Sequence, residues 1–139
     1  MRGNQTSIIP YIAISVLMIG STSALYVHAV QNSQLNDPTT LLINNEMFQV
    51  GSIFDQFSNT TITTDDGEKT GVQLSLLLLS TDLSCPTCHM YTLIASDGYQ
   101  QTVTWNDIEK GVITMEKRAY FPDFAHSFWV RDIIEIEVN

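Results

Sequence analysis

Cys85-Pro86-Thr87-Cys88-His89-Met90 runs directly into Tyr91-Thr-Leu-Ile-Ala-Ser-Asp-Gly-Tyr99. The first part holds both cysteines of the chain and one of its three histidines. The residues from Tyr91 to Ala95 are apolar and rich in β-branched and aromatic types, and Asp97-Gly98 is a turn signal. The chain then returns through Gln100 to Trp105 with alternating apolar residues. This pattern predicts a β-hairpin that begins just after the cysteine motif.

The sequence on either side of this hairpin predicts short helices and further strands. The run of β-branched residues at Asn59–Thr64 is typical of a strand, and the leucine-rich stretch 71–80 favours a helix. Such a mixture indicates an α+β domain. Two further strands are expected at 41–43 and 130–138, and in the second of them Ile134, Ile136 and Val138 share one face. A turn is expected at 65–69. We also expect a helix that includes Phe48 and ends near Phe57, and a helical turn capped at 106–107 that ends at 110.

The N-terminal part of the chain has the character of a membrane anchor. Ile8 to Val30 contains no charged side chain apart from the titratable His28, and it is long enough to span a bilayer as a helix. Arg2 precedes it, so the positive-inside rule places the N-terminus in the cytoplasm and exports the rest. A cleavable signal peptide ending near residues 27–29 is the alternative. We therefore expect an anchor at 1–30, a linker at 31–40 and a domain at 41–139.

The exported part of the chain is strongly acidic. It carries all fifteen acidic residues of the protein and every basic residue except Arg2, which gives a net charge of about minus ten. A surface of this kind lacks the basic patch that releases counterions from phosphate backbones. The sequence therefore excludes nucleic acid as a partner, and the anchor indicates the membrane as one.

Several stretches occur together in one order, and together they resemble a known family. They are Gly71-Val-Gln-Leu-Ser-Leu-Leu-Leu78, Tyr91–Tyr99, Phe121-Pro-Asp123 and Phe128-Trp-Val-Arg-Asp-Ile-Ile-Glu-Ile-Glu-Val138. Over roughly residues 41–139 the chain resembles the oxidoreductase molybdopterin-binding domain of the sulfite-oxidase type. In that family a cysteine upstream of the Gly-Val-x-Leu stretch binds molybdenum, and residues 60–70 here contain none. The resemblance thus implies a reduced relative that keeps the scaffold, and we do not expect molybdopterin.

The cysteine motif has three interpretations, which the sequence leaves open. Cys-x-x-Cys-His in an exported protein is the attachment pattern of c-type haem, with thioethers at Cys85 and Cys88 and iron bound by His89. The same three side chains with the Met90 thioether are ligands suited to copper(I), or to zinc with a further ligand. The third interpretation is a disulfide between Cys85 and Cys88, because exported cysteines are usually oxidised.

These observations predict a membrane-anchored, extracytoplasmic accessory subunit of a membrane redox complex. Its partners would be the membrane and other subunits, with the aromatic segment Tyr120–Trp129 as a docking surface. No catalytic set of side chains is expected, so the prediction favours a protein without its own enzyme activity. The alternative is a tethered electron carrier with haem or copper at Cys85, Cys88 and His89.

Overall fold

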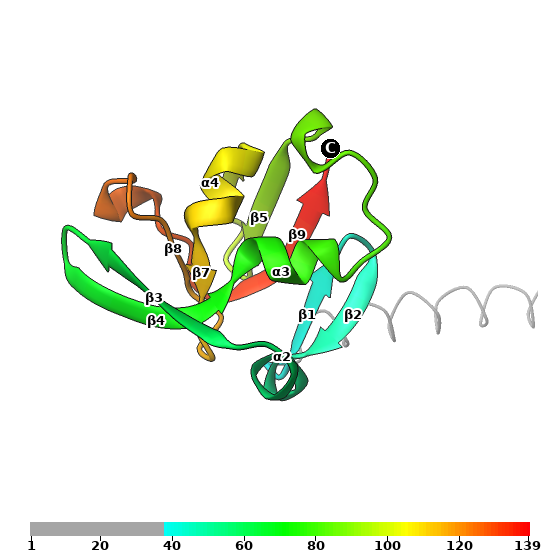
Figure 1. The fold of residues 1–139 in the computed structure, drawn as a ribbon, viewed down its shortest axis with the longest axis horizontal. Helices are drawn as coiled ribbons and strands as arrows, with labels where there is room; N and C mark the ends of the chain where they lie inside the picture. The colour runs from blue at the N-terminus through cyan, green and yellow to red at the C-terminus, as the bar shows by residue number, and fades with distance from the viewer. Residues whose placement is uncertain (1–37) are drawn as a thin grey trace, which may run out of the picture. The chain divides into compact units, whose positions relative to one another are not determined.

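The computed structural model describes residues 38–139 of the chain (Figure 1). The anchor predicted at residues 1–30 and most of the linker lie outside the described residues. Within 38–139, no helix is long and apolar enough to cross a membrane. The described residues form a small α+β domain with two sheets and short helices, which confirms the predicted fold class.

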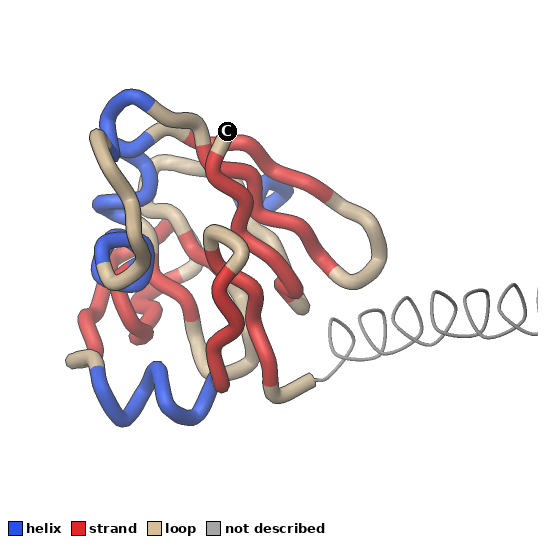
Figure 2. Tube along the Cα trace, turned by 90° about the vertical axis from the view of Figure 1, so that its right-hand side faces the viewer, coloured by secondary structure: helices blue, strands red, loops and turns tan. Residues whose placement is uncertain are grey.

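The larger sheet has five strands in the order β2-β1-β9-β5-β6. Its central strand is β9 (Ile133–Val138), which pairs in parallel with β1 (Thr40–Ile43) and antiparallel with β5 (Tyr91–Ala95). The outer strands are β2 (Glu46–Gln49) and β6 (Gln100–Val103). Figure 2 shows these strands side by side, with most of the helical segments to the left of them.

Each edge of this sheet is a hairpin closed by turn-forming residues. Asn44 and Asn45 join β1 to β2 with φ values of 49° and 64°, a left-handed conformation that asparagine tolerates well. Between β5 and β6, the Asp97 carboxylate accepts a hydrogen bond from the backbone N–H of Tyr99 at 2.9 Å, and Gly98 has a φ of +89°. The hairpin predicted over 91–105 is therefore confirmed, with β6 ending at Val103.

The smaller sheet contains a long hairpin of β3 (Asn59–Thr64) and β4 (Gly67–Gln73), followed by β7 (Val112–Ile113) and β8 (Ala119–Tyr120). The strand predicted at 59–64 is confirmed, and the turn predicted at 65–69 is confined to Asp65 and Asp66, because residues 67–69 pair with β3 as part of β4. The outer half of the hairpin projects from the rest of the domain (Figure 1), and most of its side chains are exposed. Gly71 lets the hairpin approach β7, because a Cβ there would collide with the backbone of Ile113.

The helices are α2 (Val50–Gln56), α3 (Leu74–Leu79) and α4 (Trp105–Lys110). The helix ending near Phe57 is confirmed as α2, but Phe48 lies in β2 instead of in that helix. The helix predicted over 71–80 is wrong in its first turn, since residues 71–73 continue β4 and pair with β3 and β7. Sheet pairing there overrides the helix propensity of the leucines, which takes effect only from Leu74.

The last helix and the last strand also begin away from their predicted positions. Thr104 caps α4. The backbone N–H of Thr104 donates to the Asp107 carboxylate at 2.9 Å, and the Thr104 hydroxyl donates to it at 2.6 Å. Strand β9 begins at Ile133 instead of at residue 130. A register irregularity at Ile94/Ala95 makes Ile133 fully buried beside Ile136, whereas Ile134 is only partly buried.

One hydrophobic core joins the two sheets and the helices. It is made of side chains from every layer, and its largest fully buried members are Tyr91, Phe121, Leu41, Ile43, Ile53, Leu74, Leu77, Leu78, Leu93, Ile108, Ile113 and Ile133. Burial of this apolar surface is the main force that holds β5 and α3 in place. The cysteine motif connects these two elements, so both ends of its loop are fixed by the core.

Candidate functional site

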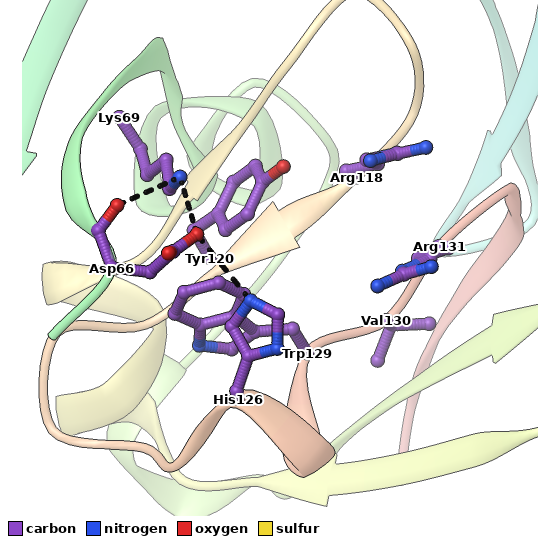
Figure 3. A pocket seen from close by; sticks show the side chains of 8 residues that line it. All are labelled: Asp66, Lys69, Arg118, Tyr120, His126, Trp129, Val130 and Arg131. Carbon is purple, nitrogen blue, oxygen red and sulfur yellow. Dashed lines mark hydrogen bonds and ion pairs between the residues drawn. The ribbon is translucent and has the colours of Figure 1, made fainter. Parts of the chain in front are cut away.

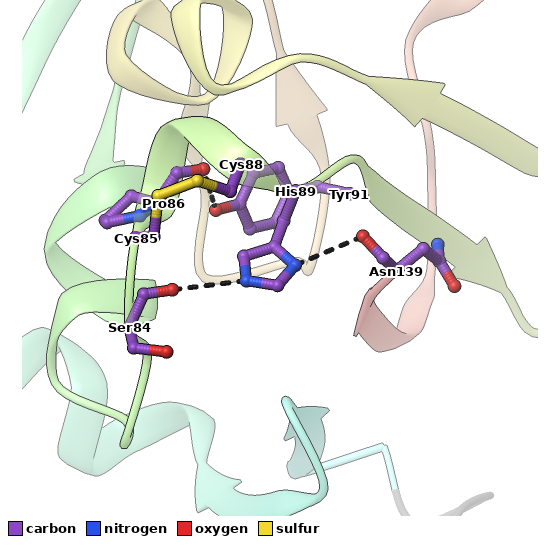
Figure 4. Close-up of a disulfide and its surroundings, with 7 residues drawn as sticks. All are labelled: Ser84, Cys85, Pro86, Cys88, His89, Tyr91 and Asn139. Carbon is purple, nitrogen blue, oxygen red and sulfur yellow. Dashed lines mark hydrogen bonds between the residues drawn. A yellow bond between two sulfur atoms is a disulfide. The ribbon is translucent and has the colours of Figure 1, made fainter.

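The cysteine motif forms a disulfide-closed loop between α3 and β5. Cys85 and Cys88 are bonded to each other, and the intervening Pro86–Cys88 forms a single 3-10 turn, η1. The backbone N–H of Cys88 donates to the carbonyl of Cys85 at 2.9 Å. Figure 4 shows the sulfur–sulfur bond that closes this turn, and both cysteines are exposed to solvent. The disulfide is therefore accessible to partners from outside the domain.

Cys85 has an unusual backbone conformation. Its φ of 51° and ψ of 67° lie in the left-handed region, which costs free energy for a residue that is neither glycine nor asparagine. This conformation lets the chain turn sharply into Pro86, the first residue of the 3-10 turn. The neighbouring structure must therefore hold the loop in place.

His89 supplies part of that support. Its Nδ1 lies 3.2 Å from the backbone oxygen of Asn139, and its Nε2 lies 3.1 Å from the backbone oxygen of Ser84. Both oxygens are acceptors, so a neutral imidazole donates to one of them and an imidazolium donates to both. Figure 4 shows the ring between these two backbone segments. The histidine thus links the start of the loop to the residue that follows β9.

Tyr91 supplies the second support from beneath the loop. Its ring is fully buried and packs against Trp105 at a centroid distance of 5.6 Å. Its hydroxyl donates a 2.6 Å hydrogen bond to the carbonyl of Pro86, and burial raises the pKa of the phenol. Because His89 and Tyr91 both hold the loop by hydrogen bonds, its position does not depend on the disulfide alone.

The structure brings the predicted ligands together in this loop, where the two cysteines form a disulfide. The Cys85 and Cys88 sulfurs are bonded to each other, and both nitrogens of His89 face backbone oxygens. Met90 lies just before β5 and is 43% exposed. Within residues 38–139, no three His, Cys, Asp or Glu side chains are grouped as a metal site. The haem and metal interpretations stay predictions, and the disulfide is the one that the structure contains.

A second cluster of polar side chains surrounds a cavity of about 200 Å³ next to the β3–β4 turn (Figure 3). It is lined from four directions: by the turn and β4, by β8 and the residue before it, by the second 3-10 turn η2 (His126–Phe128), and by the segment that leads into β9. The lining residues are Asp66, Lys69, Arg118, Tyr120, His126, Trp129, Val130 and Arg131.

Asp66 organises one side of this cavity. Its carboxylate lies 3.0 Å from the Lys69 ammonium and 3.4 Å from Nε2 of His126. The hydrogen bond from Lys69 is the main cause of the lowered pKa of Asp66, with a smaller contribution from His126. The Lys69 nitrogen also lies 5.3 Å from the centre of the Tyr120 ring and 5.7 Å from that of Trp129, within the range of cation–π attraction.

Sequence reasoning did not find this cavity. From the sequence, Asp66 and Lys69 belong to an expected turn, and Trp129 to Arg131 belong to one of the motifs that carry the family resemblance. The residues lie far apart in the chain, and only the pairing of β4, β7 and β8 brings them together. The sequence shows only that basic residues are few. That three of them converge on one cavity can be seen only in the three-dimensional structure.

No protein-family model, curated protein or solved structure matches this chain. The similarity to molybdopterin-binding oxidoreductase domains therefore stays a prediction from the sequence motifs. The function of the chain has to be inferred from the geometry of the cysteine loop and of the cavity.

Proposed function

We propose that this protein is a membrane-anchored, extracytoplasmic accessory subunit of a membrane redox complex. The observation that carries the proposal is the exposed disulfide between Cys85 and Cys88. Such bonds form and persist in oxidising compartments outside the cytoplasm. The disulfide thus supports the same placement that Arg2 and the apolar N-terminal segment predict.

The loop geometry supports a role in a redox setting. Cys-x-x-Cys pairs with accessible sulfurs exchange readily with thiols of partner proteins. Here the hydrogen bonds of His89 and Tyr91 also hold the loop, so we expect it to keep its position when the sulfur–sulfur bond is opened. A neighbouring subunit with a dithiol could reduce this disulfide and be oxidised to a disulfide itself, while the domain stays folded.

The aromatic segment predicted for docking is divided between core and surface. Phe121 and Trp129 are buried, and Phe128 is 49% exposed beside the partly buried Phe124. The surface available to another subunit is therefore Phe128 and its surroundings, where a small apolar hollow is lined by Gln101, Asp123, Phe124, Ala125 and Phe128. Aromatic side chains of this kind are enriched in protein interfaces.

The first test is the size of the native assembly. Membranes containing the full chain are solubilised in mild detergent and separated by native electrophoresis. The proposal expects the chain in a complex larger than itself, and Phe128→Ala should release it. Leu79→Ala is a matched control, because Leu79 is 53% exposed on a different element, α3. Migration of the native chain only as a free monomer would refute the accessory role.

The second test is the chemical state of the two cysteines in the membrane. Alkylation with and without prior reduction should show both thiols blocked in the native protein and free after reduction. A membrane-impermeant reagent, added to intact cells after a mild reductant, should label them from outside. A Soret band or stoichiometric copper in the purified protein, lost in His89→Ala, would overturn this proposal in favour of the electron carrier.

A further inference from the structure

We propose that the cavity beside the β3–β4 turn binds a small, soluble oxyanion of the phosphate type through Arg118 and Arg131. This inference does not depend on the proposed function, since it concerns a different surface of the domain. It begins with the distribution of charge. Five of the six basic residues lie within residues 38–139, and three of these five line one cavity.

The two arginines are distinguished from the other basic residues by their lack of partners. Lys110 is paired with Asp123 at 2.6 Å, Lys69 is paired with Asp66, and Lys117 donates to the backbone oxygen of Thr40. Within the part of the chain that the structure describes, the Arg118 and Arg131 side chains form no hydrogen bond or ion pair.

This lack of partners is unexpected in so acidic a protein, where fifteen carboxylates compete for six basic residues. The acidic residue closest to Arg118 in sequence is Glu116. Its pKa is lowered chiefly by the neighbouring Thr114 side chain, and the charge of Arg118 makes the smallest contribution. Positive charge without a partner therefore remains at the cavity, where an external anion can complete it.

The positions of the arginines suit an anion with several oxygens. Figure 3 shows Arg118 and Arg131 on the same side of the cavity, opposite the group formed by Asp66, Lys69 and His126. Each guanidinium offers a planar fork of N–H donors that matches two oxygens. A phosphate has enough oxygens to accept from both forks, whereas a single carboxylate satisfies only one.

The volume of the cavity and the net charge of the protein decide which phosphate-bearing ligands are suitable. A cavity of about 200 Å³ accommodates a compact group and is smaller than typical sites for drug-sized ligands. The net charge of −9 repels nucleic acid and anionic membrane surfaces at long range. A small soluble anion crosses this field at much lower cost, because it carries few charges. The ligand class is therefore free phosphate or a small phosphomonoester.

Asp66 has a specific role in this scheme. Its carboxylate forms ion pairs with Lys69 and His126 and places a negative charge at the edge of the cavity. It therefore opposes the ligand and withholds one further cation from it. Replacing Asp66 with asparagine removes the charge and frees Lys69, so the proposal expects the anion to bind more tightly. A purely structural role for Asp66 would predict no gain.

The test is a titration of the ¹⁵N-labelled full chain in a zwitterionic detergent with sodium phosphate at constant ionic strength. The two indole N–H signals are the readout. Trp129 lines the cavity, and Trp105 packs against Tyr91 outside it and serves as an internal control. The proposal expects a saturable shift of the Trp129 signal, with the Trp105 signal unchanged. Glycerol phosphate in parallel distinguishes a phosphomonoester from free phosphate, and saturation by either one supports the site.

Variants separate this site from general electrostatics. Arg118→Gln and Arg131→Gln should each weaken binding about tenfold, and Asp66→Asn should strengthen it about threefold. Lys110→Gln removes the same charge at a position that does not line the cavity, and it should leave the affinity unchanged. Equal losses in Arg118→Gln and Lys110→Gln would overturn the proposal, as would unsaturable shifts or equally tight binding of acetate.

Discussion

Two pairs of threonines lie opposite each other across neighbouring strands, one pair in each sheet. Thr61 and Thr70 join β3 to β4 with their hydroxyls 2.8 Å apart, and both are exposed. Thr92 and Thr102 join β5 to β6 with their hydroxyls 2.9 Å apart, and Thr92 is buried and also accepts a hydrogen bond from Asn139. The chemistry of the pairs is the same, and their surroundings differ.

This difference extends to the two sheets as a whole. In the five-stranded sheet, the central strands place side chains such as Leu93 and Ile136 in the core with no exposure to solvent. In the smaller sheet, the outer half of the β3–β4 hairpin is mostly exposed and contributes Asp66 and Lys69 to the cavity. The five-stranded sheet and the inner part of the smaller sheet thus share the core, whereas the outer half of the hairpin presents the polar cavity at a place where substitutions cost little.

The largest effect that this comparison predicts is at Leu93. Leu93→Ala should lower the free energy of unfolding by about 2–5 kcal/mol, because it leaves a cavity in the core. Ile62→Ala in the exposed hairpin should cost less than about 1.5 kcal/mol, since that side chain is only partly buried. Urea denaturation of the two variants measures the difference, and equal losses would mean that the outer half of the hairpin contributes as much to stability as the centre of the larger sheet.

The next effect is at Gly71, where the hairpin joins the body of the domain. Gly71→Ala should destabilise the protein by about 1–3 kcal/mol, because the added methyl group meets the backbone of Ile113. Gly51→Ala is the matched control, since a Cβ at that position in α2 has no neighbour within 4 Å and alanine favours the helix. Thermal melting should therefore show a lower midpoint for the first variant and an equal or higher midpoint for the second.

The two threonine pairs sharpen the comparison at constant chemistry. In double-mutant cycles with alanine, we expect a coupling energy of about 1 kcal/mol between Thr92 and Thr102. For Thr61 and Thr70 we expect a coupling energy of only a few tenths of a kcal/mol. The reason is that Thr92 is buried, so water replaces its lost hydrogen bond to Thr102 less well than it does at the exposed pair. A larger coupling energy in the exposed pair would contradict this explanation.

Local signals in the sequence were sufficient for much of the fold. The Asp97-Gly98 turn and the β-branched run at 59–64 were correctly interpreted because their determinants lie within a few residues. The disulfide was among the predicted alternatives, because the cysteines of exported proteins are usually oxidised. Sequence alone could not decide among the alternatives, because thioethers, metal bonds and a disulfide place the same demands on the spacing of Cys85 and Cys88.

Errors arose where contacts distant in sequence decide the outcome. Residues 71–73 have leucine neighbours that favour a helix, yet pairing with β3 and β7 makes them a strand. The cavity was missed for the same reason, because Lys69, Arg118 and Arg131 are brought together only by the order of the strands in the smaller sheet. Charge composition indicated that cations were scarce but could not show that they converge.

The smallest effect concerns Glu135, a partly buried carboxylate on β9, the central strand of the five-stranded sheet. Burial, and to a lesser extent the charge of Glu137, raises the pKa of Glu135 above its ordinary value of 4.5. The folded protein therefore holds this proton to a higher pH than the unfolded chain does. The resulting contribution to stability is complete below pH 4.5 and is lost as the pH rises through the folded-state pKa.

Glu135→Gln removes this loss, so the variant should be more stable than the wild type at pH 7 and nearly equal to it at pH 4. The gain should be less than about 1 kcal/mol, because solvent still reaches the carboxylate. Glu68→Gln in the exposed hairpin is the control, and it should change stability at neither pH. Urea denaturation at both pH values is the measurement. A gain from Glu68→Gln equal to that from Glu135→Gln would show relief of general charge repulsion instead of a cost specific to the partly buried position of Glu135.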